Sequence, residues 1–186
     1  MYRKIFLSFL AFIFLLPVQV EAATYNYSIN ETRFPDATFR NFVKQNYDTN
    51  NNNQLDIAEY ENIEMINVSG KGISDLTGIE CFESLTELYC QNNNLSKLDI
   101  SKNTELEILF CFNNRNLSEL DLTKNTSLTR VSCYGCNIAE LDITKNTALT
   151  WLKCSSNGMT DLDLSYNKSI TWLDCSDNNL TDLDLS

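Results

Sequence analysis

A short stretch rich in carboxylates and amides offers the oxygen atoms that a hard cation prefers. Residues 48–59 read DTNNNNQLDIAE, with ionisable carboxylates at Asp48, Asp56 and Glu59. Calcium takes about six to eight oxygen ligands from carboxylates, amides, backbone carbonyls and water. The stretch therefore predicts a calcium site.

The spacing of these residues matches the EF-hand loop, in which ligands stand at fixed positions. Gln54 would give its backbone carbonyl, Asp56 would act through water and Glu59 would bind through both oxygens. Asn53 stands where glycine is expected, and asparagine is the next-best residue for the left-handed conformation of that turn. The alternative is a polar, asparagine-rich loop between two helices. The predicted ligands, in loop order, are Asp48, Asn50, Asn52, Gln54, Asp56 and Glu59.

A helix is expected to lead into this loop. Pro35 and Asp36 suit the first turn of a helix, where a proline nitrogen needs no partner and a carboxylate meets free N–H groups. Apolar residues then follow at helical spacing. They are Phe39, Phe42, Val43 and Tyr47.

The rest of the chain nearly repeats itself. Units begin at residues 85, 106, 128, 149 and 170, so the steps are 21, 22, 21 and 21 residues. Each unit matches the leucine-rich repeat pattern, L-x-x-L-x-L-x-x-N/C-x-L, with cysteine at the third leucine. A fainter unit starts at Ile63, which makes six units over 63–186, the last incomplete. We therefore predict an α/β solenoid with a parallel sheet on its concave face, covered at its first layer by a helical N-terminal cap over residues 23–62.

The period places two kinds of residue in interior columns. Parallel strands about 4.8 Å apart keep stacked cysteines too far apart and too parallel for disulfides, so free thiols are expected. Asparagine amides in the other column can satisfy backbone groups in the tight loops, and Cys136 replaces one of them. The columns are Cys90, Cys111, Cys133, Cys154 and Cys175, and Asn93, Asn114, Asn157 and Asn178.

Alternation along each strand turns another set of side chains toward the concave side. Grouped exposed aromatic residues favour a recognition surface. Alternatively, the rings pack on one another as cross-strand pairs. The predicted ligand-binding residues are Tyr89, Phe110, Phe112, Tyr134, Trp151 and Trp172.

The opposite side carries columns of acidic residues. A solvated face that keeps the protein soluble is the simpler interpretation, and weak extra cation binding is the alternative. The columns are Asp99, Asp121, Asp142, Asp163 and Asp184, and Glu119, Glu140, Asp161 and Asp182.

The repeat with cysteine in place of a leucine resembles internalin-type bacterial repeats, in particular the internalin J-like form that carries a cysteine ladder. The stretch from Ile73 to Ile79 is also similar to an internalin-type first repeat. The resemblance covers about residues 63–186. It implies the fold, and it implies a partner bound through variable strand residues without naming that partner.

Composition excludes several classes of function. The 186 residues carry a net charge of −11 and no basic cluster, which disfavours nucleic acid as a partner. The chain has no histidine, which removes histidine-based catalysis and the common zinc sites.

Residues 1–22 read as a signal peptide with cleavage after Ala22, so we expect a secreted or cell-surface protein with no membrane span after cleavage.

These observations predict a secreted recognition module, not an enzyme, that binds a protein or glycan on its concave face and holds structural calcium in its cap. A structural spacer without a ligand is the second interpretation. A carboxylate-based glycosidase is the third, but such enzymes need a converging pair of acids in a cleft, and here the acids lie in repeat columns.

Overall fold

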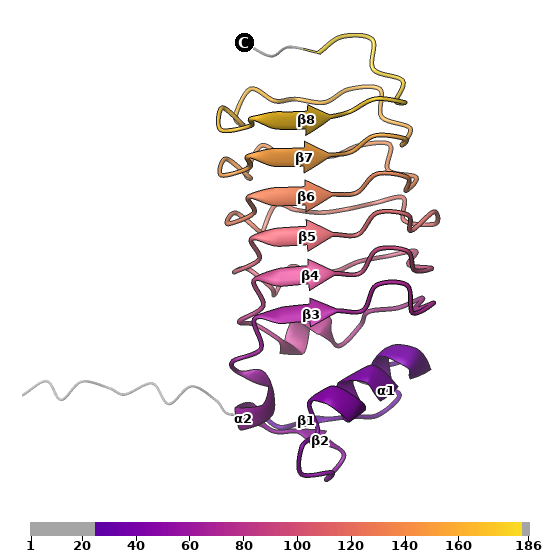
Figure 1. Ribbon diagram of the computed structural model, residues 1–186, viewed down its shortest axis with the longest axis vertical. Helices are drawn as coiled ribbons and strands as arrows, with labels where there is room; N and C mark the ends of the chain where they lie inside the picture. The colour runs from indigo at the N-terminus through magenta and orange to yellow at the C-terminus, as the bar shows by residue number, and fades with distance from the viewer. Residues whose placement is uncertain (1–24, 184–186) are drawn as a thin grey trace, which may run out of the picture.

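The computed structural model describes residues 25–183 as a stack of parallel strands with a small helical cap at its N-terminal end (Figure 1). The predicted signal peptide lies outside the described residues. The six strands follow chain order in one sheet, and each adjacent pair is parallel, which confirms the predicted solenoid. They are β3 (Met65–Asn67), β4 (Glu87–Tyr89), β5 (Ile108–Phe110), β6 (Arg130–Ser132), β7 (Trp151–Lys153) and β8 (Trp172–Asp174).

The register aligns equivalent repeat positions across the sheet. The middle residue of each strand points inward, and Leu88, Leu109, Val131 and Leu152 have no exposed surface. The flanking residues face the concave side, since successive side chains of a strand alternate between faces. Equivalent positions are therefore stacked on direct neighbours, as the repeat period predicts.

The asparagine column bonds each turn to the turn before it. Asn114 donates from Nδ2 to the carbonyls of Cys90 (3.1 Å) and Cys111 (2.7 Å), and its Oδ1 accepts the N–H of Leu95 at 3.0 Å. Asn157 makes the equivalent three bonds two repeats further along. Because buried backbone groups without partners are costly, these amides make the tight turns possible.

Cys136 occupies the asparagine column beside the longest repeat. Asn114 and Leu117 are three positions apart, whereas Asn93 and Leu95 are two apart. The extra residue lets the N–H of Leu117 bond to the carbonyl of Asn114 at 2.9 Å, inside its own loop. No side-chain acceptor is then needed at position 136, which explains why cysteine fits there.

A second buried asparagine column, which sequence reasoning missed, closes the opposite side of the coil. Asn125 donates from Nδ2 to the carbonyls of Ile100 (3.0 Å) and Asn103 (2.8 Å), both in the preceding repeat. The same position in the repeat recurs as asparagine throughout, which was the available signal. The column holds Asn103, Asn125, Asn146 and Asn167.

The cap covers the first layer of the solenoid, beneath β3 in Figure 1. It contains β1 (Tyr27–Ser28), α1 (Ala37–Asn46), β2 (Gln54–Leu55) and α2 (Ile57–Tyr60), and a 3-10 helix, η1 (Ile79–Cys81), follows in the first repeat. Phe39 and Val43 of α1 are fully buried, and the Tyr47 ring lies 5.3 Å from that of Phe82. The predicted helix and its apolar side are therefore present.

Asp36 joins the cap to the repeats. Its Oδ1 accepts the N–H groups of Thr38 and Phe39 and so caps α1, while its Oδ2 accepts the N–H (2.8 Å) and hydroxyl (2.9 Å) of Ser74. Burial alone would raise the pKa of Asp36, but these hydrogen bonds outweigh it and lower the pKa. One carboxylate thus fixes both the start of the helix and its place on the solenoid.

No helix within residues 25–183 combines the length and the apolar content that crossing a bilayer requires.

Mutation can show whether an asparagine of the first column contributes more to stability than the cysteine that replaces it at position 136. Asn114→Ala leaves the N–H of Leu95 without its acceptor and removes the amide donor from the Cys90 and Cys111 carbonyls, which keep only Asn93 Nδ2 and a long thiol contact, so it should lower the free energy of unfolding by about 2–4 kcal/mol. Cys136→Ala, the matched control at the same repeat position, should cost less, because its thiol makes one long contact to the Cys111 carbonyl. Urea unfolding of both variants measures the difference, and equal losses would contradict this account of the column.

Candidate functional site

The predicted aromatic residues come together on the concave face. Tyr89 and Phe110 share one column of paired strand positions, and Trp151 and Trp172 share the neighbouring column. Phe112 and Tyr134 follow the ends of β5 and β6. Five of the six rings are half-buried and Trp172 is 42% exposed, so the group forms a continuous ring surface that solvent still reaches.

The rings contact one another closely. Trp151 and Trp172 stack with centroids 4.5 Å apart and 7° between planes, and Phe112 and Tyr134 stack at 4.5 Å and 13°. Phe110 links the two groups, with its centroid 5.9 Å from Trp151 and 6.4 Å from Phe112. Such pairs add about 0.5–1.5 kcal/mol each beyond their buried area. The cross-strand packing considered from the sequence is therefore real, and it fixes the shape of the exposed surface.

Two cations lie among the rings. The Arg130 guanidinium is 5.8 Å from the Phe110 centroid and 5.7 Å from that of Trp151. The Lys153 ammonium is 4.5 Å from the Tyr134 centroid and 3.3 Å from an Asp174 carboxylate oxygen. The alternation along each strand predicts that both residues are exposed on the concave side, but it does not reveal their contacts with the rings.

The loop over residues 48–59 makes the left-handed turn that the predicted motif requires at Asn53. Asn53 adopts φ +60°, the left-handed conformation that glycine usually supplies at this position. Asp48 is 5% exposed, and its carboxylate accepts the N–H groups of Asn52 (3.0 Å) and Asn53 (3.1 Å). The loop then enters β2, where Leu55 pairs with Tyr27. Asparagine at the glycine position therefore does not prevent the turn.

The side chains of this loop bond to one another. Asp56 Oδ2 receives the amide groups of Asn50 (2.7 Å) and Asn52 (3.0 Å). Glu59 accepts from the N–H and hydroxyl of Thr49, both at 2.7 Å, and from the N–H of Asp56 at 3.0 Å. Burial opposes ionisation of Glu59, but the hydrogen bonds outweigh it and lower its pKa.

As arranged, the loop does not bring three acidic side chains to one point. Within residues 25–183, no three Asp, Glu, Cys or His side chains form a group that could hold a metal ion. Gln54 donates its N–H to the Asn52 side-chain oxygen at 2.7 Å. The predicted ligand atom of Gln54 is its backbone carbonyl oxygen, which this bond does not use. The donor types and the turn fit calcium, and in this structure Asp56 Oδ2 accepts two side-chain amide groups.

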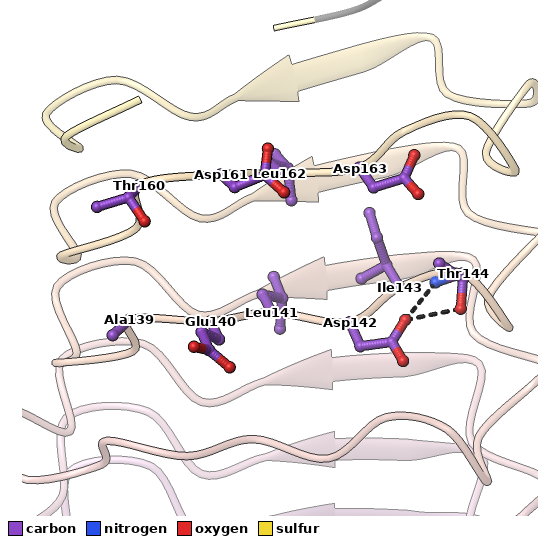
Figure 2. Close-up of a pocket in the computed structure, with 10 residues that line it drawn as sticks. All are labelled: Ala139, Glu140, Leu141, Asp142, Ile143, Thr144, Thr160, Asp161, Leu162 and Asp163. Atoms are coloured by element: carbon purple, nitrogen blue, oxygen red, sulfur yellow. Dashed lines mark hydrogen bonds between the residues drawn. The ribbon is translucent and has the colours of Figure 1, made fainter. Parts of the chain in front are cut away.

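The acidic columns lie on the outer side of the solenoid. Figure 2 shows Glu140 and Asp142 on one coil and Asp161 and Asp163 on the next, around a hollow of about 380 Å³. Asp142 Oδ1 accepts from the hydroxyl (2.7 Å) and N–H (2.9 Å) of Thr144, and these bonds lower its pKa. Equivalent bonds hold Asp99, Asp121 and Asp163 to the residue two positions on. These carboxylates close the turns of their own coils, and Asp184 lies outside the described residues.

Solved structures share this fold. A leucine-rich repeat protein of Leptospira interrogans superposes with a TM-score of 0.63 at 22% identity, over 67% of this chain and 34% of that one. The functional domain of InlJ from Listeria monocytogenes, described as including a cysteine ladder, matches over 87% of this chain and 50% of that one, with 26% identity and a TM-score of 0.42. No protein-family profile matches the chain.

One curated protein matches in sequence as well. Internalin J of Listeria monocytogenes serotype 4b (strain F2365) is 34% identical over 71 residues, which are 38% of this chain and 8% of that protein. Over that stretch the chain is similar to the internalin-type leucine-rich repeats of this relative. The chain thus corresponds to a small part of that relative, and the leucine-rich repeat fold is typical of protein-interaction modules.

The cysteines of the solenoid are free thiols. All seven are unpaired, and Cys90, Cys111, Cys133 and Cys154 are buried in one column. Burial raises the pKa of the Cys154 thiol to about 12, and it raises those of Cys111 and Cys133 well above their usual value. Buried neutral thiols pack as small apolar groups. The expectation of a ladder without disulfides is confirmed.

The raised thiol pKa values predict a loss of stability in alkali. The unfolded chain releases thiol protons near pH 9, whereas the folded chain retains them, so the contribution is complete below about pH 9 and lost as pH rises toward 12. Thermal unfolding measured from pH 7 to 11 should show a falling Tm above about pH 9. Alkylation of the native protein at pH 8 should modify the half-buried Cys136 and Cys175 first, and rapid modification of Cys111 would contradict the buried ladder.

Proposed function

We propose that this chain is a secreted recognition module that binds a protein or glycan ligand on its concave face. The observation that carries the proposal is the connected group of six aromatic rings, five half-buried and one 42% exposed, on one side of the sheet. Aromatic side chains that are held rigidly lose little conformational entropy on binding and commonly dominate binding energy. The predicted signal peptide and the internalin-type repeats support secretion.

The alternatives have less support. In a spacer the rings would serve only to stabilise neighbouring strands, but the sheet already has a fully buried opposite face and does not require a large apolar surface on the concave side. A glycosidase would need two carboxyl groups that converge in a cleft. The outer carboxylates of Asp121 and Asp142 instead bond to threonines of their own turns.

Substitution of the rings tests the concave face. A glycan array and a pull-down from extracts of neighbouring cells would first supply a ligand. Phe110→Ala or Trp151→Ala should then weaken binding at least about thirtyfold, since loss of an anchor residue costs about 2 kcal/mol or more. Asp142→Ala, on the outer side, should have little effect. Isothermal titration calorimetry gives the affinities. If Asp142→Ala abolished binding and the two ring substitutions did not, the ligand would bind the outer side and the proposal would be wrong.

We also propose that the loop over residues 48–59 binds structural calcium. Its ligands would be the side chains of Asp48, Asn50, Asn52, Asp56 and Glu59, with the backbone carbonyl of Gln54. A water on the cation would replace the amide groups that now donate to Asp56. Few formal charges imply modest affinity, which suits the high calcium concentration outside cells. Because α1 leads into this loop and is fixed to the first repeat through Asp36, calcium would stabilise the covered end of the solenoid.

Calcium titration of the purified chain tests this second proposal. Calcium at about one hundred times its Kd should add about 2.7 kcal/mol to the free energy of unfolding and raise the Tm accordingly. Asp48→Ala and Glu59→Gln should reduce this calcium-dependent shift, whatever they do to stability without calcium. Asp99→Asn, in an outer turn, is the matched control and should leave the shift unchanged. A Tm unmoved by millimolar calcium, together with no heat of binding, would refute the site.

A further inference from the structure

We infer that the ligand of the concave face is a protein segment that presents a carboxylate side chain to Arg130, beside an apolar side chain that packs on the rings. This inference deepens the proposed function and depends on it. It rests on the place of Arg130, on the charges around it and on the direction in which the rings face.

Arg130 is held at the centre of the ring surface. It begins β6, with Ile108 and Trp151 as its partners on the two neighbouring strands. Its guanidinium lies within 6 Å of two ring centroids, those of Phe110 and Trp151, the usual range for a cation–π contact. The side chain is exposed, yet these contacts limit its freedom. A planar guanidinium fixed in this way is suited to bind a carboxylate through two parallel hydrogen bonds.

The other charged groups of the strands already have partners. Lys153 pairs with Asp174 at 3.3 Å, and Glu87 accepts the Tyr89 hydroxyl at 2.7 Å. The Ser176 hydroxyl, with further bonds from its N–H, Ser155 and Lys153, lowers the pKa of Asp174 to about 2, which keeps that acid ionised beside its lysine. None of the four ion pairs found within residues 25–183 includes Arg130. The strand face therefore presents one guanidinium without a carboxylate.

The stacked rings favour an anion over a sugar. Trp151 and Trp172 stack across neighbouring strands, so their planes face each other and their edges point away from the sheet. Phe112 and Tyr134 are arranged alike. A pyranose ring packs against an open aromatic face, and in each stacked pair the two faces that meet are covered by the partner ring. Ring edges carry partial positive charge, which adds to the attraction that Arg130 exerts on a carboxylate.

The acidic body of the protein limits this recognition to short range. The chain has a net charge of −11, so an acidic partner is repelled at a distance, although at about 0.1 M salt the repulsion is screened beyond about 10 Å. A ligand with one or two acids beside apolar residues fits this balance better than a strongly acidic one.

Selection from a random peptide display library provides the probe. Peptides enriched on the purified chain should carry Asp or Glu next to an aromatic or branched aliphatic residue. A synthetic copy of one such peptide should bind Arg130→Gln at least about tenfold more weakly than the unchanged protein, and Arg130→Lys should restore only part of the loss. Lys97→Gln makes the same change in net charge on the outer side, where Lys97 pairs with Asp75, and should have little effect.

A double-mutant cycle separates this inference from the proposed function. Replacing the acid of the peptide by its amide should weaken binding to the unchanged protein but not to Arg130→Gln, because the contact is then already absent. If Trp151→Ala weakens peptide binding and Arg130→Gln does not, the concave face is the site but the carboxylate contact is wrong. If no peptide is enriched, the inference fails, and the glycan array and pull-down decide the proposed function separately. If an enriched peptide binds both variants as well as the unchanged protein, the peptide does not use the concave face and the inference fails. Binding of neutral glycans unaffected by Arg130→Gln would also overturn the inference.

Discussion

The structure depends on the satisfaction of backbone hydrogen bonds in the turns between strands. Each coil has only three strand residues, so most of its backbone polar groups lie outside the sheet ladder. Two asparagine columns supply the missing partners, with Asn114 and Asn125 as representative members. Their amides reach into the preceding coil, so each repeat supplies hydrogen bonds that its neighbour needs. The exception at Cys136 follows the same constraint, because the longer loop before it bonds internally.

Stacking leaves the apolar interior of the first repeat without a neighbouring coil, and the N-terminal cap covers it. Asp36 both begins α1 and bonds to Ser74 of the first repeat. The rings of Tyr47 and Phe82 then close the apolar layer between cap and solenoid. The loop over residues 48–59 follows directly from this helix. A change in the conformation of the loop therefore affects how the helix covers the first repeat. A cation in the loop would therefore act on the whole first layer.

Regular stacking also decides what the concave face offers. Equivalent positions repeat every coil, so residues that vary between repeats meet on adjacent strands and form a surface that no single repeat contains. Phe110 contacts the rings of Tyr89 and Trp151, which come from other strands. Arg130 lies near the rings of Phe110 and Trp151. The acidic residues follow the opposite rule, because they recur at one position and each serves its own turn. Variation is thus concentrated where a partner would bind, and repetition where the coil must close.

The sequence by itself determined the parallel solenoid, the inward leucines and cysteines, and the columns of exposed residues, because a fixed period leaves little freedom in register. It also placed the loop of Asp48 and Glu59 after a helix. Only the tertiary structure decided which rings stack, that Lys153 has a carboxylate partner while Arg130 has none, and that Asp56 is held by amide groups. These depend on side-chain conformations and on contacts between strands, and the repeat period constrains positions along the chain but not the direction in which a side chain turns.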